Sequence, residues 1–398
     1  MKKKDRTRTE STTTRVLKWL AFFCLGIIAA YLVIVAALLY SVYYGPDQSS
    51  TSNQVTQTEN SEEAESEVTF DVSSWSNEEL AAQMLIIMAP SNDTAGFYIL
   101  AHYGVGAITL SGGKPVPETP RELAAAQAEV ARGIPMLVCS DEEGGEVAHL
   151  ADLVGALPAP ADIIELEYDE ITAMTRAHGE KLAAIGVHAV LAPTLDLAEP
   201  DTYMTRLGRS FGADPAEVTD YGRAWIEGMH EAGLAVTLKH WPGIGSAPDT
   251  HAYSNAVHAL DVMEQRDMVP FDTLIGEGAE MVMLGHVMVP GLTEPDTAVS
   301  LSPAAYAYLR EHSGPDLIIM TDCLSMAGAI KGQNLSIAQA AVRSIAAGAD
   351  LVMAGAMDTA DVIDELSSAI DTGIIDRSQA ELSVQKLLRL KASKGLIE

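Results

Sequence analysis

The sequence predicts an α/β fold, a (β/α)₈ barrel that forms a single domain over residues 69–398. Two observations indicate it. Eight short apolar runs alternate with longer amphipathic stretches over roughly 320 residues. Polar residues with useful chemistry follow most of these runs at the same end, and the active sites of such barrels lie at the C-terminal ends of the strands.

The eight apolar runs are bounded by Gly, Pro or Asp and are rich in branched residues, as buried parallel strands are. They are MLIIMA (84–89), GAITL (106–110), PMLVCS (135–140), VHAVLA (187–192), LAVTLK (234–239), MVMLGH (281–286), LIIMT (317–321) and LVMAG (351–355). A doubly wound open sheet is the alternative. It would normally carry a Gly-rich phosphate loop after its first strand, and MLIIMAPSNDTAG is not such a loop.

Helices are expected between the runs, and three of them begin with a capping-box pattern. These patterns are Ser76-x-x-Glu79, Thr119-Pro120-Arg121-Glu122 and Ser336-x-x-Gln339. The second places Pro120 at the first helical position, where its missing N–H costs nothing.

The N-terminal part of the chain predicts a membrane anchor. Residues 19–44 carry no charge and are long enough to cross a bilayer as a helix. Residues 1–18 hold seven Lys and Arg residues, so this end is expected to stay in the cytoplasm. Residues 45–68 are rich in Ser, Thr, Gln and Glu and predict a disordered linker. The protein is therefore expected to be a single-pass protein of the cell membrane with an extracytoplasmic barrel.

The charge excludes nucleic acid as a partner. The chain has 25 basic and 55 acidic residues, a net charge of −30. Residues 1–44 account for seven basic and two acidic ones, which leaves 18 against 53, or −35, for the remainder. Such a surface repels phosphates. Cys139 and Cys323 end apolar runs and are expected to be buried free thiols, and the oligomeric state stays open.

Polar residues cluster after the predicted strands, at the end where a barrel carries its active site. They are Asp141, Asp196, Lys239, His240, His286 and Asp322. Several of them also have a purely structural interpretation, whereas Lys239 ends a buried strand and is expected to have a partner or a polar pocket. Asp322 could cap the next helix, and the two histidines could be core residues with satisfied nitrogens. The acidic run that begins at Asp141 could be a solvated loop.

The most unusual stretch is LKHWPGIGSAPDTHAYSNAV (238–257), a Gly/Pro-rich loop after the fifth run. Its Asp249-Thr250-His251 either forms a simple turn or carries a proton-transfer group. A metal site is not expected, because metal-dependent hydrolase barrels typically open with a His-x-His pair and this chain has none. No other cofactor is implied.

Four segments resemble the motifs of family 3 glycoside hydrolases, in particular the β-N-acetylglucosaminidases. They are SDEEGGEV (140–147), LGRSFGADP (207–215), KHWPGIG…DTH (239–251) and MTDCLSMAGA (320–329). They occur in the right order on the right strands, and the resemblance covers residues 70–398.

The resemblance implies a role for each matching residue. Asp322 matches the catalytic nucleophile, His251 the general acid/base and Asp249 the carboxylate that orients it. The remaining matches are contacts to sugar hydroxyls: Asp141, Arg209, Lys239 and His240. His149 occupies the position of a further sugar-binding residue, which in the family is usually Arg.

The chain departs from the family pattern at two further places. Ile244 stands where the family has a second His, and the loop before Asp249 is one residue short. Glu146 replaces an Arg, so that with His149 two positive charges are missing from the expected mouth of the site.

The sequence thus predicts a retaining glycoside hydrolase, a β-N-acetylhexosaminidase with a glycosyl-aspartate intermediate. It would remove terminal β-linked N-acetylglucosamine from cell-wall fragments or chitin-type oligosaccharides. Two alternatives remain. One is a family 3 β-glucosidase, and the other is a surface sugar-binding or sensor protein on a catalytically weakened barrel.

Overall fold

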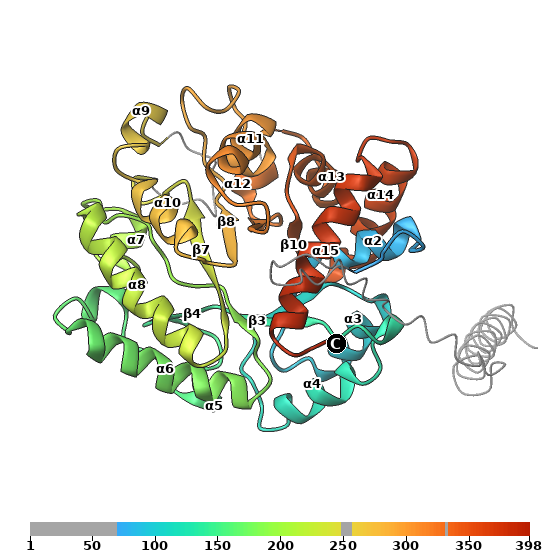
Figure 1. The fold of residues 1–398 in the computed structure, drawn as a ribbon, viewed down its shortest axis with the longest axis horizontal. Coiled ribbons are helices and arrows are strands. Elements are labelled where there is room, and N and C mark those ends of the chain that lie inside the picture. The colour runs from blue at the N-terminus through green and yellow to red at the C-terminus, as the bar shows by residue number, and fades with distance from the viewer. Residues whose placement is uncertain (1–69, 248–256, 331–332) are drawn as a thin grey trace, which may run out of the picture. The chain divides into compact units, whose positions relative to one another are not determined.

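Eight parallel strands close into a barrel in a computed structural model that describes residues 70–247, 257–330 and 333–398 (Figure 1). Their order around the barrel is β1-β10-β9-β8-β7-β6-β3-β2. The strands are β1 (Leu85–Ala89), β2 (Ala107–Leu110), β3 (Leu137–Ser140), β6 (Ala189–Val190), β7 (Ala235–Trp241), β8 (Met281–Leu284), β9 (Ile318–Cys323) and β10 (Leu351–Gly355). Each lies within or overlaps one of the eight apolar runs, so the predicted barrel is confirmed.

Helices surround the barrel and connect successive strands (Figure 1). The α-helices are α2 (Asn77–Gln83), α3 (Thr94–Tyr103), α4 (Thr119–Gln127), α5 (Ala151–Val154), α6 (Tyr168–Ala184), α7 (Tyr203–Arg206), α8 (Pro215–Glu231), α9 (Leu260–Met263), α10 (Val269–Gly276), α11 (Pro303–His312), α12 (Ala327–Ile330), α13 (Ile337–Ala347), α14 (Thr359–Asp371) and α15 (Arg377–Ser393). Short 3₁₀ turns lie at Ala131–Gly133, Pro160–Asp162, Val299–Leu301 and Ala356–Asp358.

Two of the three predicted capping boxes are confirmed. Ser76 caps α2 and Ser336 caps α13, and each serine N–H donates in return to the side chain of the third helical residue, Glu79 or Gln339. The prediction for Thr119 was wrong, because α4 begins at Thr119 itself and Glu118 is the N-cap residue. The Thr119 hydroxyl instead donates to the Ser91 carbonyl and accepts from the Val116 N–H, so it ties two loops together.

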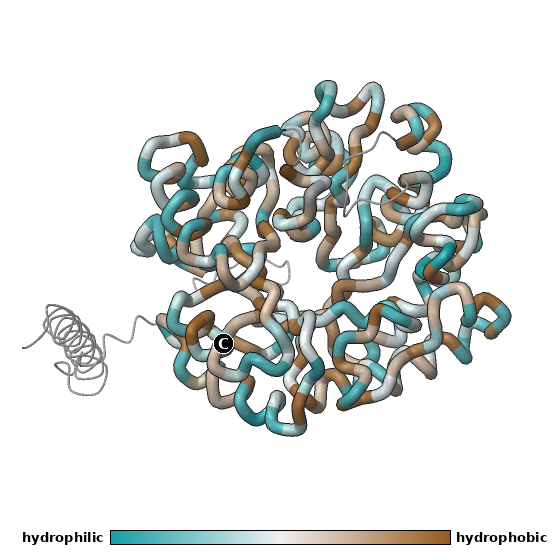
Figure 2. Tube along the Cα trace, turned by 180° about the vertical axis from the view of Figure 1, so that it is seen from behind, coloured by the Kyte–Doolittle hydropathy of each residue, from teal (hydrophilic) through white to brown (hydrophobic). Residues whose placement is uncertain are grey.

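Alternation along the strands divides the core into two layers. One set of side chains packs inside the barrel and includes Ile86, Leu137 and Met281, while the neighbouring residues pack against the helices. Figure 2 shows hydrophobic and hydrophilic positions alternating along the surrounding chain, as amphipathic helices require. Leu387 and Leu390 of α15 join the inner set, so the last helix closes the end of the barrel opposite the predicted site.

A small hairpin follows β3 and was not predicted. Strand β4 (Glu142–Gly144) pairs antiparallel with β5 (Val147–Ala148). It contains most of the SDEEGGEV motif, so the structure gives this motif a fixed backbone.

Cys139 and Cys323 are buried free thiols, as predicted. No helix among the residues that the structure describes is long and apolar enough to span a bilayer. The predicted anchor (19–44) and linker (45–68) lie outside the described residues, as do Asp249 and His251.

Candidate active site

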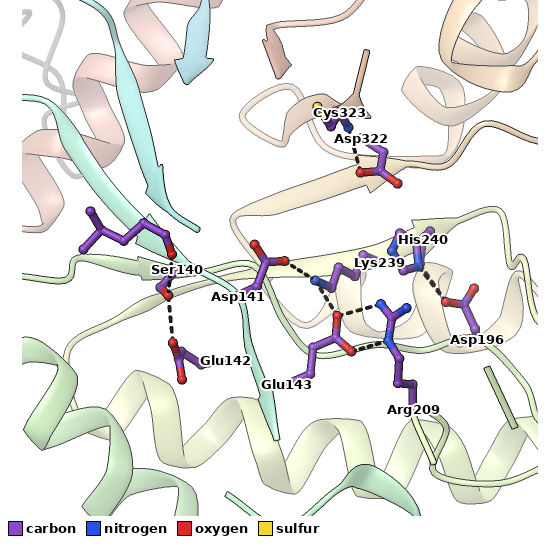
Figure 3. Close-up of polar contacts among 11 residues, drawn as sticks. Ser140, Asp141, Glu142, Glu143, Asp196, Arg209, Lys239, His240, Asp322 and Cys323 are labelled. Atoms are coloured by element: carbon purple, nitrogen blue, oxygen red, sulfur yellow. Dashed lines mark hydrogen bonds and ion pairs between the residues drawn. The ribbon is translucent and has the colours of Figure 1, made fainter. Parts of the chain in front are cut away.

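A cavity of about 520 Å³ opens at the C-terminal ends of the strands. It brings together all the predicted site residues that the structure describes, namely Asp141, His149, Arg209, Lys239, His240 and Asp322. These residues come from β9, β7, the two positions that flank the β4–β5 hairpin and the loop before α8, and Figure 3 shows most of them pointing toward one another. The clustering expected from the strand ends is therefore present.

The end of β7 presents two consecutive side chains to this cavity. Neighbouring residues on a strand normally point to opposite faces. The register of β7 against β8 shifts between Lys239 and Trp241, and both Lys239 and His240 line the cavity. The irregularity gives the site an ammonium group and an imidazole from adjacent positions.

Lys239 lies at the centre of a buried charge network (Figure 3). Its ammonium nitrogen is 2.6 Å from Asp141 Oδ1 and 2.6 Å from Glu143 Oε1. Arg209 donates two hydrogen bonds to Glu143, with Nε 2.7 Å from Oε2 and Nη2 2.8 Å from Oε1. Its guanidinium also lies 5.9 Å from the centre of the Tyr203 ring. Two cations thus share two carboxylates.

This network keeps Glu143 and Lys239 ionised although both are buried. Burial alone would raise the pKa of the Glu143 carboxyl, but Lys239 and Arg209 outweigh it and hold that pKa far below its usual range. Burial would likewise lower the pKa of Lys239, but Asp141 and Glu143 raise it above its ordinary value. Charges buried in matched pairs are stable in position, which pre-organises their remaining hydrogen-bonding capacity.

Asp196 holds the second polar group of β7 in place. Its Oδ2 lies 2.7 Å from His240 Nδ1, and its Oδ1 accepts the Ile244 N–H at 2.6 Å. Asp196 is itself completely buried. The contact at Nδ1 leaves Nε2 as the imidazole nitrogen that can serve the cavity. The sequence placed Asp196 at a strand end without assigning it this role.

Asp322 lies in β9, partly exposed, and lines the cavity. Its Oδ1 accepts the Cys323 N–H at 2.7 Å. Burial raises the pKa of this carboxyl, but His240 and His286, the Cys323 N–H and Lys239 together bring it below its ordinary value. The group is therefore a carboxylate at neutral pH. The helix-cap interpretation was wrong, because the next helix, α12, begins five residues later at Ala327.

The solvated-loop interpretation of the acidic run was also wrong. Glu142 and Glu143 are 1% and 2% exposed. They alternate along β4, so Glu143 points to the cavity while Glu142 points away from it. Glu142 accepts from the Ser140 hydroxyl at 2.7 Å and from the Leu150 N–H at 2.9 Å, and thereby fixes both ends of the hairpin.

His286 fits the core interpretation that the sequence left open. Its Nδ1 is 2.8 Å from the Ser300 hydroxyl and its Nε2 is 3.0 Å from the Cys323 carbonyl. It is completely buried and lies beside the residue that follows Asp322. His286 supports the backbone next to the predicted nucleophile.

The loop after β7 starts from a backbone that only glycine permits. A Cβ on Gly245 would lie 1.9 Å from the Leu197 carbonyl oxygen. Gly243 has φ +111°, and a Cβ there would lie 2.8 Å from the Asp267 side chain. The backbone at Gly243 and Gly245, from which the loop leads to Asp249 and His251, therefore packs closely against neighbouring segments.

The remaining wall of the cavity is apolar and contains sulfur. It is formed largely by five methionines, Met88, Met204, Met283, Met326 and Met353. The site thus has a charged side, which offers fixed donors and acceptors to hydroxyl groups, and an apolar side, which can pack against carbon–hydrogen surface. A pyranose ring has both kinds of surface.

The chain matches the glycosyl hydrolase family 3 N terminal domain over residues 77–390. It is 32% identical over 305 residues to the β-hexosaminidase LpqI of Mycobacterium tuberculosis, which covers 74% of this chain and 77% of that protein. A solved family 3 glycosyl hydrolase from Mycobacterium smegmatis superposes with a TM-score of 0.73 at 33% identity, covering 80% of this chain and 98% of the other. A family 3 β-N-acetylglucosaminidase from Paenibacillus superposes with a TM-score of 0.74 at 26% identity, covering 80% and 62%.

Proposed function

Because the chain belongs to glycosyl hydrolase family 3, we propose that it is a β-N-acetylhexosaminidase that removes terminal β-linked N-acetylglucosamine from oligosaccharides. The observation that carries this proposal is the Asp322 carboxylate, which lines the same cavity as the network of paired charges around Lys239. A retaining glycosidase needs such a carboxylate at the anomeric carbon and a separate proton donor at the leaving oxygen.

In the proposed reaction Asp322 attacks the anomeric carbon. The bond from that carbon to the leaving oxygen breaks, and His251 gives this oxygen a proton. A glycosyl-aspartate ester is the intermediate. Water then attacks the same carbon, His251 takes its proton, and Asp322 leaves as a carboxylate. Asp249 would fix the tautomer of His251 and stabilise its imidazolium form.

The charged side of the cavity supports a binding role. Asp141, Lys239 and Arg209 are already oriented by one another, so hydroxyl groups of the sugar would meet fixed partners. His240, held by Asp196, would offer a further contact, and His149 would contribute from the hairpin.

Glu143 is not available as a substitute proton donor. Its carboxylate is fully paired with Lys239 and Arg209, and they hold its pKa far below the range in which a carboxyl could carry a proton at neutral pH. This supports the assignment of the acid/base role to the loop that contains His251.

Release of nitrophenol from the N-acetyl-β-glucosaminide and the β-glucoside, measured side by side, tests the proposal. We expect turnover of the first substrate and little of the second. The reverse preference would indicate a β-glucosidase. The missing positive charges at Glu146 and His149 favour a second candidate, a sugar-binding protein, and saturable binding of N-acetylglucosamine without turnover would support it.

We further propose that residues 19–44 anchor the protein in the cell membrane, with residues 45–68 as a tether and the barrel outside the cytoplasm. The uncharged composition of the first segment and the seven basic residues before it support this. The full chain should sediment with membranes and resist carbonate extraction. A chain that starts near Ser66 should be soluble and equally active, and loss of its thermal transition would place residues 45–65 within the fold.

A further inference from the structure

We propose that Glu146 makes the mouth of the cavity select leaving groups by charge, favouring those with an ammonium group and disfavouring those with a carboxylate. This inference rests on the proposed function, and it concerns the sugar that departs and not the N-acetylglucosamine that is removed.

The cavity is electrically unbalanced. The described residues of its lining include four carboxylates, Asp141, Glu143, Glu146 and Asp322, against two permanent cations, Lys239 and Arg209. Four negative and two positive charges leave a net charge of −2 when the histidines are neutral. A cleft lined by one sign of charge concentrates the field and attracts ligands of the opposite sign.

Neither cation can offset Glu146, because both are committed elsewhere. The Lys239 ammonium lies between Asp141 and Glu143 at 2.6 Å from each. Arg209 is bound to Glu143 through two hydrogen bonds. Glu146 is exposed and forms no hydrogen bond or ion pair with another described residue. Among the described residues that line the cavity, Glu146 is therefore an exposed carboxylate whose charge a substrate would meet without a paired cation.

The backbone holds Glu146 at the rim. It follows the hairpin turn of Gly144 and Gly145, with φ of +101° and +61°. The Gly145 N–H donates to the Leu157 carbonyl at 2.9 Å. A Cβ on Gly144 would lie 2.1 Å from the Pro158 carbonyl oxygen. The turn is thus packed directly against a neighbouring segment, which limits the positions that the next side chain can reach.

The leaving group must extend toward this rim. Lys239 and Arg209 are 2% and 8% exposed and lie deep in the cavity, where the sugar to be removed is expected to bind. The rest of the substrate leads outward past exposed residues. A reducing-end N-acetylmuramic acid would bring its carboxylate toward Glu146, whereas a glucosamine would bring an ammonium group. The preferred class is therefore chitin-type, partly deacetylated oligosaccharide.

Three β-1,4-linked disaccharides with the same non-reducing N-acetylglucosamine test this. Their reducing-end sugars are glucosamine, N-acetylglucosamine and N-acetylmuramic acid. kcat/KM is measured with the full chain in detergent at low salt, in two series. At about pH 8 an ordinary imidazole is neutral, so the histidines add no charge to the cavity. A second series at about pH 7 is needed because the ammonium group of glucosamine is only partly charged at about pH 8. We expect the order glucosamine, N-acetylglucosamine, N-acetylmuramic acid.

Glu146→Gln should reduce the ratio of kcat/KM for the glucosamine and N-acetylmuramic acid substrates by about 2- to 5-fold, the range for one exposed charge pair. Glu146→Lys should reduce it further, and added salt should weaken the wild-type preference. Glu129→Gln is the matched control, because Glu129 is exposed and follows the far end of α4, so it should leave the ratio unchanged.

An unchanged ratio in both Glu146 variants would overturn the inference. So would an equal change in the Glu129 variant, since that would assign the preference to the net charge of the protein. Turnover of the neutral nitrophenyl N-acetylglucosaminide, measured in parallel, keeps the two proposals apart. Its absence would contradict the proposed function, whereas its presence with no charge preference would contradict only the role of Glu146.

Discussion

Among the described residues, each end of the barrel buries one lysine, and the two lysines differ in what surrounds the charge. At the C-terminal end of the strands Lys239 is 2% exposed and contacts two carboxylates, Asp141 and Glu143. At the opposite end Lys391 of α15 is completely buried, and its ammonium nitrogen lies 2.9 Å from Gln83 Oε1. The carboxylates raise the pKa of Lys239 above its ordinary value, whereas burial lowers the pKa of Lys391 to about 7.

The difference separates function from stability in this barrel. The upper end, at the C-terminal ends of the strands, keeps several charges ionised by pairing them, although the desolvation of such groups costs folding free energy. The lower end, at the N-terminal ends of the strands, seals the core with Leu387 and Leu390, and its lysine is only partly charged near neutral pH. Substitutions at the upper end should therefore affect activity or leave a charge unpaired, and those at the lower end should affect stability alone.

Asp322→Asn should give the largest loss of activity, and it tests whether a substitution at the upper end can remove activity without changing stability. We expect kcat to fall by at least about 10³-fold, because an amide cannot form the glycosyl-enzyme intermediate. The thermal transition should stay near that of the wild type, since the carboxyl faces the cavity. Nitrophenol release and circular dichroism measure the two. Near-normal turnover in the folded variant would exclude Asp322 as the nucleophile.

His251→Ala separates acid catalysis from binding at the same end. A good leaving group needs little protonation, so its hydrolysis should suffer less than that of a disaccharide. The gap in kcat/KM between a nitrophenyl glycoside and a disaccharide should approach about 10²- to 10⁴-fold, the usual contribution of general acid catalysis. Asp249→Asn should act in the same direction but more weakly. Equal losses on both substrates would mean that His251 only shapes the pocket.

Lys239→Met and Lys391→Met compare the two ends directly. The first removes the ammonium from two carboxylates and should lower the free energy of unfolding by about 3 kcal/mol, since Glu143 still keeps Arg209. The second replaces a buried amine with an apolar chain of similar size and should be neutral or stabilising at neutral pH. Urea denaturation measures both. Similar losses in the two variants would show that the ends do not differ.

The sequence predicted the barrel well because its signals are local. All eight strands fall on apolar runs, and the capping boxes at Ser76 and Ser336 formed as their spacing indicates. The prediction for Thr119 was wrong because the Thr119 hydroxyl donates to the distant Ser91 carbonyl and does not cap the helix. Short-range patterns hold unless a distant group competes for the same atoms.

The sequence predicted which residue types form the site and at which strand ends they lie, but it did not predict which side chains contact one another. Strand ends identified Asp141, Lys239 and Asp322, yet nothing local showed that Glu143 would bind both Lys239 and Arg209, which is 66 residues away. The period-2 spacing of Asp141 and Glu143 was an available signal, because it places both on one face of a strand. The burial of Lys391 had no such signal, since α15 also carries charged residues that are only partly buried, such as Arg377 and Arg389.

The pH dependence of stability should distinguish the two ends through Lys391. Its pKa is about 7 in the folded chain and about 10.4 when unfolded, so between these values the unfolded state binds more protons. The free energy of unfolding contributed by this group therefore rises with pH, by at most about 1.4 kcal/mol per unit. Below about pH 7 the cost of burying the charge is fully present, and above about pH 10.4 it is absent.

Lys391→Met removes this contribution and leaves the other titrating groups in place. The wild type should therefore gain stability relative to the variant between about pH 7.5 and 9.5, measured as the difference in urea unfolding free energy at each pH. Lys239 gives the contrast, because its pKa is raised and its own contribution is lost only as pH rises beyond the ordinary lysine range. A difference between wild type and Lys391→Met that is flat with pH would mean that Lys391 keeps its proton when buried, and the contrast between the two ends would fail.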